Sequence, residues 1–127
     1  MMRFELVGGL IILPIVFEYS TKVKVQADAL VDTGSAGTAL DINLLKLDPA
    51  RSSRIVELAG IGGNQDVVIQ RVDNIQFSSK TVSGFEVEFG DVATKFGFNA
   101  IIGFDLLDAV GACIDYERKE IRVSSER

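Results

Sequence analysis

The sequence predicts an all-β protein, a closed barrel of short strands with one short helix near its C-terminus. Short stretches rich in Val, Ile and Phe recur along the chain, and turn-forming residues separate them about every ten residues. The chain has 127 residues, of which 47% are hydrophobic, and this length suits one domain with a substantial core. We therefore expect a single domain over residues 1–127, with its core at roughly residues 10–124.

The first predicted elements are a strand and its hairpin partner. We expect a buried strand at residues 11–17, with Pro14 tolerated at an edge or a bulge. Residues 21–27 alternate polar and apolar side chains, which is typical of a half-exposed strand that pairs with the first. The chain then runs through Asp28 into the apolar residues 29–31, which lead into an Asp-Thr-Gly loop.

Further elements follow from alternation and turn signals. Strands are predicted at residues 55–59, 66–72, 74–77, 85–89, 112–116 and 120–123. The apolar residues 100–102 are predicted as a further buried strand, which ends at Gly103. Residues 105–110 predict the short helix, and Asp41 is expected to cap a helical turn over residues 41–45. Glu86 and Glu88 alternate with Phe and Val, so we expect both glutamates on a solvated face.

The loop Asp32-Thr33-Gly34-Ser35 allows two interpretations. The common one is a turn in which the Asp32 carboxylate caps its own loop. The other is a catalytic acid placed at the end of a buried strand. In both, Gly34 has no Cβ and leaves its N–H free to approach the carboxylate.

Composition excludes several classes of chemistry. The chain has no histidine, which removes Ser-His-Asp and Cys-His catalysis and the common zinc hydrolase motifs. Its one cysteine, Cys113, forms neither an internal disulfide nor a cysteine-based zinc site, and is expected to be a small core residue. The net charge of −5 argues against a nucleic-acid-binding surface. A hydrolase of this composition must use carboxylates, or hydroxyls with lysine.

The apolar run at residues 6–17 has a competing interpretation as a signal peptide or anchor. Glu5 precedes it and no small-residue cleavage site follows. The run is also shorter than the about 20 apolar residues of a membrane span. We expect a buried strand, no membrane association and a cytoplasmic location, which the lack of disulfides favours.

Three motifs, in this order, resemble those of the retropepsin-like aspartic proteases. They are the Asp-Thr-Gly-Ser loop after an Ala-Leu-Val strand, the glycine-rich hairpin tip at residues 60–63, and the Ile-Ile-Gly-x-Asp-Leu-Leu segment at residues 101–107. The resemblance covers roughly residues 10–124. It implies the single-lobed acid-protease barrel and an aspartic endopeptidase that uses water as its nucleophile, with neither metal nor cofactor.

The resemblance assigns roles to individual residues. Asp32 is the catalytic acid, Thr33 reaches across a two-fold axis to the partner's loop, and Gly34 donates its N–H to the carboxylate. The flap that covers an extended peptide substrate contains Ile61, Gly62 and Gly63, and the second glycine loop contains Ile102 and Gly103. The apolar side chains of Ile61 and Ile102 suggest a preference for apolar residues beside the scissile bond.

The number of motifs predicts the assembly. Peptide hydrolysis by carboxylates needs one ionised and one protonated group, which share a proton. The chain has one Asp-Thr-Gly and is too short for two lobes. We therefore expect a homodimer, with Asp32 of each subunit at the two-fold axis.

The sequence departs from the retroviral pattern near this loop. Ser35 stands where alanine is usual, and we expect its hydroxyl to bond the Asp32 carboxylate and lower its pKa. Ala36, Gly37 and Phe104 replace the acids and the arginine that link loop and helix, so Phe104 is expected to provide the link by packing. The polar residues 124–127 are not expected to form the terminal strands that join retroviral dimers.

Two other functions compete with the protease. One is a retropepsin-like interaction module with weak or no activity, against which the intact Asp32-Thr33-Gly34 argues. The other is a small β-barrel that binds a ligand or carbohydrate, with Asp32 only a turn cap.

Overall fold

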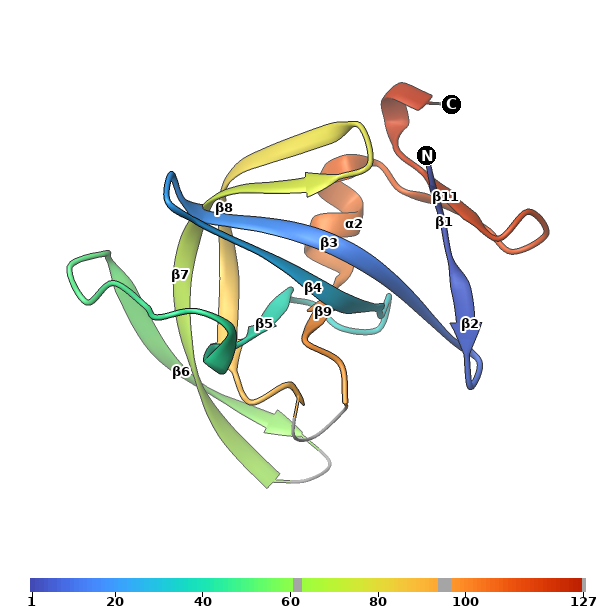
Figure 1. The fold of residues 1–127 in the computed structure, drawn as a ribbon. Coiled ribbons are helices and arrows are strands. Elements are labelled where there is room, and N and C mark those ends of the chain that lie inside the picture. Colours follow the sequence, from blue (N-terminus) through green and yellow to red (C-terminus); the bar gives the residue numbers. More distant parts are fainter. Residues whose placement is uncertain (61–62, 94–96, 127) are drawn as a thin grey trace.

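A closed ring of six strands forms the body of the molecule in the computed structural model, which describes residues 1–60, 63–93 and 97–126 (Figure 1). Around the ring the strands are β3 (Leu10–Ser20), β4 (Val23–Val31), β9 (Ala100–Ile102), β5 (Ala39–Asp41), β8 (Lys80–Gly90) and β7 (Gly63–Phe77). The ring closes where β3 pairs with β7, with Phe17 opposite Ile75. The predicted closed β-barrel is confirmed.

The N-terminal hairpin forms as expected. β3 and β4 pair antiparallel from Ile12 opposite Leu30 to Ser20 opposite Val23. Pro14 lies between the part of β3 that pairs with β2 (Glu5–Val7), which ends at Ile12, and the part that pairs with β7. Within the described residues, β3 is therefore open on one side at Pro14, and the missing N–H is tolerated there. None of the described helices is long and apolar enough to cross a membrane.

Alternate side chains along the strands point into the barrel and fill its interior. In β3 every second residue from Ile11 to Tyr19 is buried, because successive side chains of a strand point to opposite faces. The largest fully buried side chains include Phe17, Phe77 and Phe89, which come from three different strands. These side chains fill the interior, which is therefore a packed core. Burial of each such side chain contributes about 1.5–3 kcal/mol to stability.

The two strands predicted at residues 66–72 and 74–77 are one strand, β7, of 15 residues. The strand is continuous because pairing with β8 continues through Asn74 to Phe77 opposite Lys80. The N-terminal half of β7 pairs with β6 (Ser53–Gly60), and Gly60 lies opposite Gly63. The predicted glycine-rich hairpin is confirmed, and it projects beyond the barrel (Figure 1). Ile61 and Gly62 lie outside the described residues.

Asp41 precedes a 3₁₀ turn, η1 (Ile42–Leu44), but does not cap it with its side chain. The buried Asp41 carboxylate instead accepts hydrogen bonds from the backbone N–H groups of Val92, at 3.1 Å, and Ala93, at 3.4 Å. The expected cap is therefore wrong. The carboxylate joins the end of β5 to the segment after β8.

The predicted helix is α2 (Phe104–Val110), which ends at Gly111 in the left-handed conformation at φ 62°. After it, β10 (Cys113–Asp115) and β11 (Glu120–Arg122) form a small sheet with β1 (Met2–Arg3). Cys113 is only partly buried in this sheet and has a free thiol. The sequence analysis identified neither β1 nor β2.

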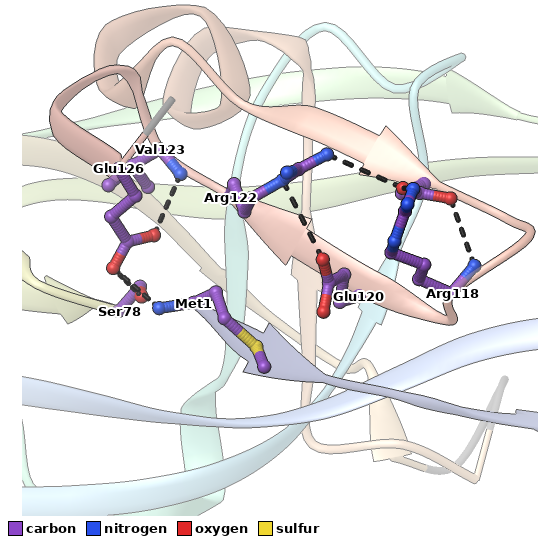
Figure 2. A network of polar contacts seen from close by, with 8 residues as sticks. Met1, Ser78, Arg118, Glu120, Arg122, Val123 and Glu126 are labelled. Carbon is purple, nitrogen blue, oxygen red and sulfur yellow. Dashed lines mark hydrogen bonds and ion pairs between the residues drawn. The ribbon is translucent and has the colours of Figure 1, made fainter.

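Both terminal segments of the described chain contact other parts of the same chain. β1 and β11 lie side by side (Figure 1), and Met2 pairs with Ile121. Residues 124–126 form a 3₁₀ turn, η2 (Ser124–Glu126), rather than a strand. The Glu126 carboxylate accepts a hydrogen bond from the Met1 amine at 2.5 Å, and also from the Ser78 hydroxyl and the backbone N–H of Val123. Figure 2 shows these contacts.

Candidate active site

Asp32 lies at the end of β4, in the loop that the sequence singled out. Its backbone N–H donates to the Ile102 carbonyl at 2.9 Å, which extends the parallel pairing of β4 and β9 by one residue. The Gly34 N–H donates to Asp32 Oδ1 at 3.0 Å, as expected. A turn cap and a catalytic acid would both make this bond, so the surroundings of the carboxylate must distinguish them.

The two glycine loops contact each other through their backbones. A Cβ atom on Gly103 would lie 2.2 Å from the Gly37 carbonyl oxygen and 2.8 Å from that of Ser35. The N–H of Phe104 donates to the Ser35 carbonyl at 2.7 Å. Only glycine fits at position 103, because a side chain there would push the Asp32 loop away.

Thr38 and Asp105 connect the Asp32 loop to α2. Thr38 is fully buried, and its hydroxyl donates to Asp105 Oδ1 at 2.7 Å. The same hydroxyl accepts the Gly103 N–H at 3.2 Å. These hydrogen bonds, rather than packing by Phe104, link the loop to the helix. The sequence analysis missed it, although a threonine six residues after Asp32 and an acid in the first turn of the helix were available signals.

Phe104 does not provide that link. Its side chain is 58% exposed, so the expected packing against the loop is wrong. Ser35 also differs from expectation, because its hydroxyl donates to the Gly37 carbonyl at 2.9 Å. A hydroxyl has one proton to donate. The proposed effect of Ser35 on the Asp32 carboxylate therefore has no basis in this geometry.

A cleft of about 290 Å³ lies between Asp32 and the β6–β7 hairpin. Asp32, Ser35, Ala39 and Ile101 line it from the barrel side, and Leu58, Ala59, Gln65 and Val67 line it from the hairpin. Ile102 is fully buried in the core, and its neighbour Ile101 faces the cleft instead. Asp32 and residues of the hairpin thus line the same cleft.

Glu88 also lines this cleft, which corrects its expected place on a solvated face. The side chain is partly buried, and burial together with the nearby negative charge of Asp105 raises the pKa of its carboxyl group. A Cβ on Gly37 would lie 2.6 Å from Glu88 Oε1. Glu88 therefore fills the space beside the loop that a side chain at position 37 would take.

Thr33 and Phe104 share a second, shallow groove. Both are exposed, and the groove between them is lined by Leu107, Ala112 and Ile114. The Thr33 hydroxyl makes no hydrogen bond within residues 1–60, 63–93 and 97–126. This surface lies next to Asp32 in the sequence and leaves Thr33 accessible to a partner.

No protein-family model matches the chain, and no curated protein matches it.

Proposed function

We propose that the protein is an aspartic endopeptidase in which Asp32 of two subunits forms one catalytic pair. One observation carries the proposal: the Asp32 carboxylate lies in a cleft roofed by the β6–β7 hairpin. A carboxylate that only capped a turn would need no such surroundings. The order of motifs in the sequence points to the same chemistry.

In the proposed reaction the two carboxyl groups share one proton, because two like charges at short separation do not both ionise readily. The ionised carboxylate takes a proton from water while the water oxygen attacks the peptide carbonyl carbon. The protonated carboxyl group donates to the developing oxyanion. The carboxyl group that took the water proton then passes it to the leaving nitrogen as the C–N bond breaks. A hydroxyl group of the tetrahedral intermediate returns a proton to the other carboxylate, and a new carboxyl terminus and a new amine are released.

Exposed residues beside Asp32 support a two-fold assembly, because they are accessible to a second subunit. One subunit provides one Asp-Thr-Gly loop, so the pair is incomplete without a second copy. Thr33 and Phe104 are exposed beside Asp32 and provide a contact surface at the place where the axis must pass. The terminal segments are tied within their own chain, so we place the contact at the Thr33–Phe104 groove.

An extended peptide suits the cleft. Backbone N–H and C=O groups of the hairpin and the floor pair with an added strand, and side-chain pockets provide selectivity. Ile101 and Leu58 give the cleft apolar surface on both sides. We therefore expect apolar side chains next to the scissile bond. A ligand inside the barrel is not favoured, because Phe17, Phe77 and Phe89 fill the interior.

The test is cleavage of a mixed peptide library from about pH 4 to 7, where a shared proton on such a pair is expected. Wild type is compared with Asp32→Asn, which keeps the shape and removes the titrating acid. Asp28→Asn is the matched control, because Asp28 is an exposed acid on β4, four residues before Asp32. Cleavage by wild type and the control but not by Asp32→Asn supports the proposal, and equal cleavage by all three rejects it.

A further inference from the structure

Glu88 holds an unusual position for a carboxylate in this protein. It lies on β8, and its backbone N–H donates to the Thr38 carbonyl at 2.9 Å, so it is fixed beside the Asp32 loop. Its side chain lines the same cleft as Asp32. Both carboxylate oxygens lie within 2.7 Å of the place where a Gly37 Cβ would be. The charge is thus held against the loop and away from the outer surface.

No positive group of the described residues neutralises this carboxylate. Residues 1–60, 63–93 and 97–126 provide it with neither an ion pair nor a side-chain hydrogen bond. Asp105, which faces it from α2, is an acid too. Glu86, two residues earlier on the same strand, is by contrast bonded to Arg54 at 2.9 Å and to Arg71 at 3.3 Å.

A partly buried charge without a partner costs free energy that a bound cation recovers. This free energy can contribute to ligand binding, because no ion pair among the described residues has already recovered it. Carboxyl groups in a cleft that are perturbed by burial and by a neighbouring charge, as Glu88 is, are enriched at functional sites. A cation bound there also offsets the repulsion between Glu88 and Asp105.

We propose that Glu88 is a specificity-determining residue that binds a lysine or arginine side chain of the peptide in the Asp32 cleft. The inference rests on the proposed peptidase function and narrows its substrate class. The preferred peptide carries apolar residues next to the scissile bond and one basic residue that reaches Glu88. The Glu88 carboxylate pairs with the basic group and takes no part in the bond-breaking steps.

The test uses peptides in which each position in turn is lysine or norleucine, which has a similar length and no charge. The specificity constant for cleavage, kcat/KM, is measured for wild type, Glu88→Gln and the control Glu86→Gln. At one position, wild type and the control should prefer lysine by about tenfold or more, as expected for a charge-assisted contact. Glu88→Gln should lose that preference and still cleave the norleucine peptide.

Two results overturn the inference while leaving the peptidase proposal intact. One is cleavage by wild type without preference for lysine at any position. The other is a lysine preference that survives in Glu88→Gln. If no variant cleaves any peptide, binding of the same fluorescently labelled peptides decides. Lysine-dependent binding that is lost in Glu88→Gln supports the inference, and equal binding to wild type and Glu88→Gln rejects it.

Discussion

Gly103 faces Gly37 so closely that a Cβ on Gly103 would lie 2.2 Å from the Gly37 carbonyl oxygen. Two loops separated by more than sixty positions in the chain therefore touch through bare backbone. The contact places the end of β9 against the loop that carries Asp32. Any side chain at position 103 must displace one of these two loops.

Gly103→Ala is expected to destabilise the fold by about 3 kcal/mol, as overpacking against backbone does, and to abolish cleavage by shifting the Asp32 loop. Urea denaturation and a cleavage assay measure the two effects. Gly84→Ala is the control, because Gly84 has a φ of +61° and open space around its Cβ position. Alanine at position 84 adds left-handed backbone strain of about 1 kcal/mol but no close contact, whereas Gly103, at φ −94°, has the close contact without that strain. Equal losses in both variants would contradict this account.

Thr38→Val removes the hydroxyl that joins the Asp32 loop to Asp105 and the Gly103 N–H. Buried groups left without partners cost about 1–3 kcal/mol, and we expect a loss of stability of that size in urea denaturation. Thr38→Ser should restore most of it, since the hydroxyl returns. Thr81→Val at an exposed strand position serves as the control. A loss as large in Thr81→Val as in Thr38→Val would remove the special role of Thr38.

The carboxyl group of Glu126 makes the stability of the folded state depend on pH. Its pKa is lowered to about 2, first by the bond to the Met1 amine and then by the Val123 N–H and Ser78. A carboxyl group with a depressed pKa stabilises the folded state above its unfolded value of 4.5, and that stability is lost as the pH falls toward about 2. The effect therefore belongs to the acid range and is complete at neutral pH.

Glu126→Gln should be less stable than wild type at neutral pH, and the difference should shrink between pH 4.5 and about 2. Denaturation curves along a pH series measure it. Glu5→Gln, at an exposed position on β2, is the control. A difference that stays constant down to the lowest pH would show that the charge of Glu126 is not responsible.

Phe104→Lys tests the proposed dimer surface. A charged side chain in place of a 58% exposed phenylalanine beside Thr33 should raise the dimer dissociation constant at least about tenfold, as loss of a central aromatic contact does. Sedimentation equilibrium measures this constant. Ile55→Lys is the control, since Ile55 is 72% exposed on β6. Unchanged association of Phe104→Lys would place the interface elsewhere.

Local patterns predicted much of this fold. The apolar run at residues 11–17 and the alternation at residues 21–27 predicted the β3–β4 hairpin, and the apolar run before Asp32 predicted the loop that carries it. β1 was not predictable, because two residues carry no periodicity and their partner, Ile121, is far along the chain. Its existence depends on tertiary pairing.

The site shows the same limit. The bond from Gly34 to Asp32 is local, and the sequence predicted it. The Thr38–Asp105 bond joins residues 67 positions apart, so no short motif indicates it. Glu88 was misplaced because alternation separates the two faces of a strand but does not show that a loop and a hairpin cover the outer one.

The most direct test of the central claim is a mixing experiment with wild type and Asp32→Asn. Wild-type chains are held at constant concentration and co-refolded with increasing amounts of the variant, and cleavage is followed. If one site needs two Asp32 residues, about nine parts of variant to one of wild type leave about a tenth of the wild-type chains in wild-type dimers. Activity should then fall about tenfold. Activity that stays constant as the variant is added would show that each chain acts alone, and would contradict the shared catalytic pair.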